Sequence, residues 1–192
     1  MKKKLFFVIF TAIFSVAFFS CNDLFTNPQS GGNNLLKNPS FEMNGKPSLK
    51  YWSFRDTSNL HLVQFSNDMP TKDGTNSVIL NTTQPYPLSW CSICQSIPLS
   101  NGKHVYKFSC WAKNEGISGN VYIFFKNKNI DEIKYDKQIE IKDTIWTNYS
   151  ILDTINAGKT DSAIVVLSGG SSELLPGKTY FNYCDFEKVN GP

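Results

Sequence analysis

The segment VYKFSCWAK at residues 105–113 decides the fold class of this chain. Its side chains alternate between two sets, and a period of two predicts a β-strand whose residues point to opposite faces of a sheet. One face carries Tyr106, Phe108, Cys110 and Ala112, which we expect in the core, and the other carries Lys107, Ser109, Trp111 and Lys113. The strand is therefore expected to hold the indole of Trp111 away from the core.

Shorter runs with the same alternation lie on both sides of this strand, separated by turns rich in Gly, Asn and Asp. We expect strands at residues 60–65, 77–80, 92–99, 120–126, 138–141, 146–151, 163–167 and 180–189, after a first ordered segment at 35–42 that Pro39 interrupts. The only helical candidate is Asn129–Asp136, which could also be a loop. About ten short strands predict an all-β protein, a β-sandwich of the jelly-roll kind.

The N-terminus has the features of an export signal. Three lysines precede an uncharged run of 16 residues, Leu5–Ser20, which is directly followed by Cys21. The run is shorter than the ~20 residues of a bilayer-spanning helix, and a basic end with a short apolar core is typical of a signal peptide. The cysteine at the junction resembles that of a bacterial lipoprotein, whose thiol receives a diacylglyceryl group. The alternative is an uncleaved anchor helix.

This interpretation divides the chain into a signal peptide at residues 1–20, a lipid anchor and flexible tether at 21–34, and one domain at 35–192. The tether contains Asn27-Pro28 and Ser30-Gly31-Gly32, which is linker composition. The expected location is the cell envelope, on the outer membrane, at its periplasmic face or at the cell surface. The membrane would then be a partner through the lipid on Cys21.

The charge balance argues against a nucleic-acid partner. Three of the 19 Lys and Arg residues lie in the signal, which leaves 16 positive charges against 16 negative ones. A nucleic-acid-binding domain normally shows a basic excess or a basic stripe. We therefore expect no nucleic acid among the partners.

The remaining cysteines are Cys91, Cys94, Cys110 and Cys184. Cys91 and Cys94 lie in an alternating segment, where residues three apart are roughly 10 Å apart, too far for a disulfide. A redox or zinc role for this pair is therefore not expected. Cys110 and Cys184 should both point inward, either as two buried thiols or as an inter-strand disulfide.

Several segments, taken together and in order, resemble carbohydrate-binding modules of families 4, 9 and 22, which are jelly rolls of the galactose-binding-like fold. They are NLLKNPSFE at 34–42, DGTNSVIL at 73–80, CQSIPLSNGKHVYKFSCWAK at 94–113, TIWTNYS at 144–150 and GKTYFNYCDFEKV at 177–189. Gln95 shares one face of its predicted strand with the aliphatic residues Ile93, Ile97 and Leu99. We therefore interpret it as a buried structural side chain that must find hydrogen-bond partners.

The resemblance implies a structural calcium ion near the ends of the sandwich. Glu42 matches the acidic ligand after the opening Phe, Asn182 stands where the family often has Asp, and Asp73 lies in the turn between them. Oxygen ligands of this kind suit calcium, although the Asn removes one formal charge. The alternative is that Glu42 is simply a solvated or hydrogen-bonded carboxylate.

The resemblance also implies non-catalytic binding of a polysaccharide or oligosaccharide. A pyranose ring stacks its C–H face on a flat aromatic side chain, so outward aromatic residues are the candidates. They are Trp111, Trp90, Tyr86, Tyr122 and, with core packing as the alternative, Trp52; nearby polar candidates are Ser92, Gln84, Asn81 and Lys107. Three or more outward rings on one concave sheet would favour sugar. A flat apolar patch with few such rings would favour the other hypothesis, an envelope protein-interaction or adhesion module.

Catalysis has little support in the sequence, and we expect no enzyme. The two histidines, His61 and His104, lie in no HExxH, GxSxG or Cys-His arrangement. Paired carboxylates suited to a glycosidase occur only as Asp131-Glu132, in a polar segment, and as Asp185 with Glu187.

Overall fold

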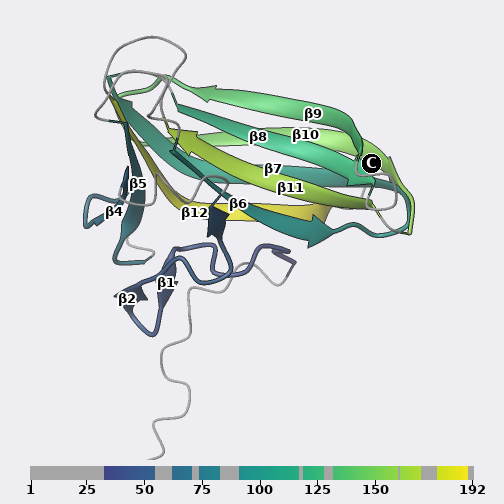
Figure 1. The fold of residues 1–192 in the computed structure, drawn as a ribbon, viewed down its shortest axis with the longest axis horizontal. Coiled ribbons are helices and arrows are strands. Elements are labelled where there is room, and N and C mark those ends of the chain that lie inside the picture. Colours follow the sequence, from purple (N-terminus) through teal and green to yellow (C-terminus); the bar gives the residue numbers. More distant parts are fainter. Residues whose placement is uncertain are drawn as a thin grey trace, which may run out of the picture.

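The computed structural model describes residues 33–54, 62–70, 74–82, 91–116, 119–127, 132–159, 161–169 and 177–189. These residues form twelve strands and no α-helix (Figure 1), as an all-β jelly roll requires. None of them forms a helix of the length and apolarity needed to cross a membrane. The signal peptide and most of the tether lie outside the described residues.

Two five-stranded antiparallel sheets face each other. Sheet 1 has the order β10-β7-β12-β5-β4, and sheet 2 the order β3-β6-β11-β8-β9. The strands of sheet 1 are β4 (Val63–Ser66), β5 (Ser77–Thr82), β7 (Gly102–Glu115), β10 (Thr147–Ala157) and β12 (Gly177–Val189). Those of sheet 2 are β3 (Ser53–Phe54), β6 (Cys91–Pro98), β8 (Gly119–Asn127), β9 (Glu132–Ile141) and β11 (Asp161–Gly169), and a small hairpin joins β1 (Glu42–Met43) to β2 (Lys46–Pro47).

The core lies between the two sheets and is built by alternate residues of each strand. Phe108, Phe181 and Phe186 from sheet 1 meet Ile93, Val165 and Leu167 from sheet 2, and all are 1% exposed or less. Cys110 and Cys184 are register partners in β7 and β12 and are fully buried, as expected, and both are free thiols. Burial raises the pKa of Cys184 well above that of an ordinary thiol. Cys91 points into the core and Cys94 out of it, so the pair cannot form a disulfide, as predicted.

The expected strands are confirmed where the structure describes them, although β9 begins six residues earlier and β10 ends six residues later than predicted. The helical candidate is wrong over its described part, residues 132–136, and residues 129–131 lie outside the described residues. β9 begins at Glu132 and pairs with β8 along its whole length, with a register shift opposite Phe125 and Lys126. A bulge adds one residue to a strand and so interrupts its alternation. Because of its polar composition and this interruption, the segment shows no strand pattern in the sequence, although long-range pairing with β8 stabilises a strand there.

The segment before β1 was expected to be the first ordered segment of the domain, and it does not form a strand. It lies along β12, where the Asn34 amide donates to the carbonyl of Cys184 at 3.0 Å and accepts from the N–H of Phe186 at 3.1 Å. Asn34 was assigned to the tether, so the tether ends at least one residue earlier than predicted. Asn38 and Phe41 have positive φ values of 52° and 59°, which breaks the extended backbone that a strand would need.

Candidate functional site

The outer face of sheet 1 carries the partly exposed indole of Trp111. Its neighbours along β7, Cys110 and Ala112, are fully buried, so Trp111 points away from the core as predicted. Across the sheet its register partners are Asn148 of β10 and Asn182 of β12. Asn148 is exposed and gives the ring a polar neighbour on this face, whereas Asn182 is fully buried.

A second indole lies on the same face. Trp146 comes directly before β10, two residues ahead of Asn148, and is therefore a diagonal neighbour of Trp111. Such neighbours are about 7–8 Å apart. The ring of Trp146 meets that of Tyr180 in β12 edge to face, with 6.2 Å between centroids. Three aromatic rings are thus gathered on the outside of sheet 1, although Tyr180 is only 6% exposed.

Lys113 lies between these rings and two carboxylates. Its Nζ is 4.4 Å from the centroid of the Tyr180 ring and 5.8 Å from that of Trp146. The same Nζ is 2.6 Å from Asp68 Oδ2 and 3.2 Å from Glu115 Oε1. The indole N–H of Trp146 donates to Asp68 Oδ1 at 2.9 Å, and the Tyr180 hydroxyl donates to Glu115 Oε2 at 2.9 Å. The network fixes the orientation of both rings.

The network also sets the protonation of its members. Hydrogen bonds from Lys113 and then from Trp146 hold the pKa of Asp68 below the ordinary value for Asp. Burial favours the neutral form of Glu115, but hydrogen bonds from Tyr180 and Lys113 outweigh it, so the pKa of Glu115 is also lowered. A glycosidase needs one carboxyl group whose pKa is raised so that it can act as a general acid. Neither Asp68 nor Glu115 meets this requirement.

The other carboxylate pair on this face is Asp185 and Glu187. Burial, and then the charge of Glu187, raises the pKa of Asp185. Glu187 is 4.0 Å from Lys107 Nζ. The Oδ1 atom of Asp185 is buried and has no hydrogen-bond partner among the described residues.

The predicted aromatic set is not gathered on one face. Tyr122 points out of sheet 2, where it stacks on Phe124 at 5.8 Å between centroids, and so lies on the side of the sandwich opposite to Trp111. Trp52 is in the core at 5% exposure, with its indole N–H bonded to the Asn38 carbonyl at 3.0 Å, so it cannot serve as a platform. Trp90 and Tyr86 lie outside the described residues.

The polar candidates are also divided. Lys107 and Asn81 lie on the outer face of sheet 1 and Ser92 on that of sheet 2, whereas Gln84 lies outside the described residues. Asn81 is 8% exposed, and its Oδ1 is buried without a partner among the described residues. Trp146, Tyr180 and Asp68 were not singled out from the sequence. Alternation within β7 predicts that Lys113 shares a face with Trp111, but only the register between strands brings the other three beside it.

The residues proposed for calcium converge on Asn76, just before β5. Glu42 Oε1 accepts hydrogen bonds from the backbone N–H of Thr75, from the Thr75 hydroxyl at 2.8 Å and from the Asn76 amide at 3.1 Å. Asn182 donates its amide to the Asn76 carbonyl at 2.8 Å, and its own Oδ1 is buried without a partner among the described residues. Asp73 lies outside the described residues. Asn76 thus links Glu42 to Asn182, and an orphaned amide oxygen in a cluster with a carboxylate and a carbonyl fits a hard cation such as calcium.

Carboxylates are otherwise scattered. In the part of the chain that the structure describes, no three His, Cys, Asp or Glu side chains gather where they could hold a metal ion. A cation at this place would therefore depend on Glu42, on the Asn76 carbonyl and on the Asn182 amide oxygen.

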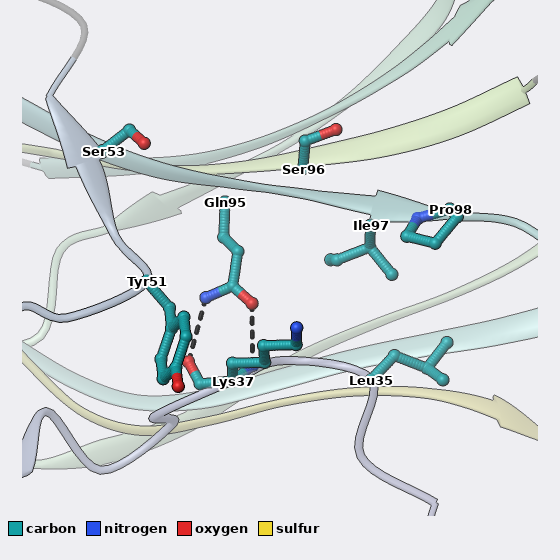
Figure 2. Close-up of a pocket in the computed structure, with 8 residues that line it drawn as sticks. All are labelled: Leu35, Lys37, Tyr51, Ser53, Gln95, Ser96, Ile97 and Pro98. Atoms are coloured by element: carbon teal, nitrogen blue, oxygen red, sulfur yellow. Dashed lines mark hydrogen bonds between the residues drawn. The ribbon is translucent and has the colours of Figure 1, made fainter. Parts of the chain in front are cut away.

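A groove of about 490 Å³ lies at the other side of the molecule, along the edge of sheet 2 (Figure 2). It is lined by β6, by the N-terminal segment and by the start of β3: Leu35, Lys37, Tyr51, Ser53, Gln95, Ser96, Ile97 and Pro98. Gln95 crosses its floor, accepts from the N–H of Lys37 at 2.7 Å and donates to the Lys37 carbonyl at 2.9 Å. The structural role predicted for Gln95 is confirmed, since it ties the N-terminal segment to β6.

Comparison with solved structures identifies the fold. It is the fold of carbohydrate-binding modules. A family 61 module in complex with β-1,4-galactotriose matches 81% of this chain and 99% of its own, with a TM-score of 0.57 and 18% identity. A family 16 carbohydrate-binding module matches 82% and 100%, with a TM-score of 0.54 and 16% identity. The CBM22-1 xylan-binding domain of Xyn10C from Paenibacillus barcinonensis matches 80% and 93%, with a TM-score of 0.52 and 13% identity.

No family model and no curated protein matches the sequence. The similarity therefore establishes the β-sandwich jelly roll of the carbohydrate-binding modules, as predicted. A shared fold does not fix a ligand, so function must be argued from the faces described above.

Proposed function

We propose that this protein binds a glycan without altering it, and that the sugar stacks on Trp111 and Trp146 on the outer face of sheet 1. The observation that carries the proposal is the pairing of these two partly exposed indoles as diagonal neighbours on one sheet. Indole faces match the C–H face of a pyranose, and successive rings along one face suit successive sugar units of a chain.

The polar surroundings support the same assignment. Asn148 and Ser150 are exposed on β10, and Ser109 lies between Trp111 and Lys107 on β7. These groups can donate and accept hydrogen bonds with hydroxyls at the ring edges. Lys113, Asp68 and Glu115 hold the aromatic rings in place, which lowers the conformational cost of binding.

A protein-binding module is the other hypothesis for this fold. Ile145 and Leu152 are the most exposed large apolar side chains among the described residues, at 73% and 65%. Isolated exposed apolar residues are normal on a protein surface. The aromatic residues on the outer face of sheet 1 favour sugar.

Three further features complete the proposal. The N-terminal sequence supports a lipid on Cys21 that would hold the domain at the cell envelope, on the outer membrane. The orphaned oxygen of Asn182, which shares the partner Asn76 with Glu42, supports a bound calcium ion, which would supply the missing partner of that oxygen and fasten β1 and the turn before β5 to β12. The lowered pKa values of Asp68 and Glu115, the carboxylates beside the aromatic rings, support a role in binding rather than in catalysis.

The experiment is affinity electrophoresis of the full-length chain in gels that contain β-1,4-galactan or xylan, the classes of ligand named for the similar modules. Trp111→Ala should weaken retention about tenfold, because an aromatic contact contributes ~0.5–1.5 kcal/mol beyond the area it buries. The matched control is Tyr122→Ala, which removes a partly exposed ring from the opposite face. Retention that survives Trp111→Ala and is lost with Tyr122→Ala would place the site on sheet 2 and contradict the proposal.

A further inference from the structure

The groove at the edge of sheet 2 is formed by other strands than those that carry the two indoles, and it is lined by a different set of side chains. β3 pairs with β6 through Cys94 and Ile93 alone, so within the described residues β6 has no strand partner on that side from Gln95 to Pro98. The N-terminal segment forms the opposite wall of the groove. It does not pair with β6 as a strand, because the Gln95 side chain occupies the space between them and bonds the backbone of Lys37. An open groove of about 490 Å³ remains between them.

The groove has two chemically different ends. Figure 2 shows Tyr51 at one end, Gln95 and Lys37 in the middle, and Ile97, Pro98 and Leu35 at the other end. Ser53 of β3 and Ser96 of β6 line the rim, with their hydroxyls on the side of β6 away from Gln95. An aromatic ring and an amide within one groove are groups that recognise a sugar.

The aromatic end is positively charged. Lys37 Nζ lies 5.5 Å from the centroid of the Tyr51 ring, and Lys50 Nζ lies 5.3 Å from it. Within the described residues neither lysine forms an ion pair with a carboxylate. Glu42 is the only acidic residue between positions 33 and 54, and it is 7% exposed with its Oε1 already bonded by Thr75 and Asn76. Two cations therefore lie beside one exposed ring, and no carboxylate of the described residues is paired with either of them.

The backbone of Tyr51 holds its ring at the surface. The Trp52 N–H donates to the Leu49 carbonyl at 2.9 Å, which makes Tyr51 the third residue of a turn, and its φ is 76°. The next residue, Trp52, enters the core at 5% exposure, whereas Tyr51 is 48% exposed. The turn therefore presents the Tyr51 ring to solvent beside the two lysines.

We propose that this groove is a second binding site, for a saccharide that carries a carboxylate, a hexuronic acid within a glycan chain. The carboxylate would lie between Lys37 and Lys50, and the sugar ring would contact Tyr51. A cation–π contact at an exposed site is weak, whereas a hydrogen bond to a charged group is stronger, so an arriving carboxylate can draw both ammonium groups toward itself. The proposal does not depend on glycan binding by sheet 1.

The test is a titration of the full-length chain with four-residue oligomers of galacturonate, glucuronate and mannuronate, each paired with its methyl ester. The ester keeps the sugar backbone and removes the charge. At least one acid should bind, its ester should bind at least tenfold more weakly, and added salt should weaken the acid alone, because salt screens exposed charges. Failure of all three acids to bind, or equal binding of acid and ester, would overturn the proposal.

Variants then assign the site. Lys37→Ala with Lys50→Ala should weaken the acid about tenfold, since each exposed charge pair contributes up to about 1 kcal/mol. The charge-matched control, Lys142→Ala with Lys159→Ala, removes two exposed lysines that do not line the groove and should change nothing. Tyr51→Asn removes the ring at a φ that Asn tolerates and should also weaken binding, whereas Tyr51→Phe should retain it.

Two further results separate this site from its alternatives. Trp111→Ala should leave oligouronate binding unchanged, and a loss there would move the acid to sheet 1 and overturn the proposal. The second result concerns a Cys21→Ser chain and phosphatidylglycerol vesicles. Vesicle binding that requires Lys37 and Lys50, without any oligouronate binding, would assign the lysines to an anionic membrane surface and overturn it as well.

Discussion

Lys113 organises the outer face of sheet 1 because it is the only charge shared by two carboxylates and two aromatic rings there. Its side chain is 11% exposed, whereas Asp68 and Glu115 are 47% and 46% exposed. Burial alone would lower the pKa of the Lys113 ammonium, but its hydrogen bonds to Asp68 and Glu115 outweigh that effect and raise it. The lysine therefore stays charged through the neutral range, and its stabilising effect depends on the carboxylates.

Lys113→Met should reduce the free energy of unfolding near neutral pH by about 1 kcal/mol, the scale of partly exposed ion pairs. The pKa of Asp68 is lowered below 3.8 and that of Glu115 below 4.5 in the folded protein. Their contribution is thus present above those ordinary values and is lost as pH falls through the lower folded values. Urea unfolding of both proteins at about pH 7 and pH 3 should show the difference shrinking in acid. A constant difference would mean that Lys113 acts through packing.

At the scale of the elements, the two sheets approach each other closely where β11 ends against β5. A Cβ atom added at Gly169 would lie 2.5 Å from the Leu80 Cβ and 2.7 Å from its carbonyl oxygen. Since the second contact is with backbone, a rotamer change cannot relieve it. The missing side chain of Gly169 therefore allows the two sheets to lie this close together at β11 and β5.

Gly169→Ala should destabilise the domain by about 1–3 kcal/mol, the usual cost of overpacking a well-packed interior. Gly158→Ala is the matched control, because its added Cβ would meet Asp161 at an ordinary 3.7 Å. The comparison of urea midpoints at equal m-values gives the measurement. Equal midpoints for the two variants would show that β11 can shift away from β5 at little cost.

β12 joins the proposed calcium site to the outer face of sheet 1. Its register shifts between Asn182 and Cys184, and Tyr183 takes a positive φ of 42°. This bulge aims the fully buried Asn182 toward Asn76 instead of leaving it beside Trp111 in solvent.

If calcium occupies the place beside Asn182, a chelator should lower the melting temperature by several degrees, because a bound ion stabilises the folded state only while it is present. Asn182→Asp should strengthen the site by adding the missing charge and enlarge the chelator effect. Magnesium, which prefers its own waters, should restore the melt poorly. A melting temperature that is the same with and without chelator would show that hydrogen bonds alone satisfy Glu42.

The alternation of a strand is local, so the direction of each side chain could be predicted for VYKFSCWAK and for Gln95. The register between strands depends on residues far apart in the chain. The positions of Trp146 and Tyr180 beside Lys113 could therefore not be predicted from a local sequence pattern. Tyr122 was expected to help Trp111 because both point outward, but strands of opposite sheets point outward in opposite directions. The bulge in β9 likewise has no local signal that separates it from a loop.

At the scale of the whole molecule, the two proposed sites lie on different parts of one sandwich. The two indoles lie outside sheet 1, and the cationic groove lies at the edge of sheet 2, beside the N-terminal segment. A glycan with neutral and acidic units could contact both sites. Two weak sites on one scaffold raise overall affinity through effective concentration when the ligand spans them. The lipid anchor proposed on Cys21 would decide where such a glycan is held.

Cys21→Ser in the full-length chain should release the protein from the membrane fraction, because the serine hydroxyl cannot form the thioether that carries the diacylglyceryl group. A single acyl chain gives only marginal membrane binding, whereas two or more give a stable anchor, so the loss should be nearly complete. Cell fractionation and metabolic labelling with a radioactive fatty acid measure it, with Cys94→Ser, a partly exposed thiol of β6, as the matched control. Cys21→Ser protein that stays with the membrane and is unlabelled would show that Leu5–Ser20 is an uncleaved anchor helix instead.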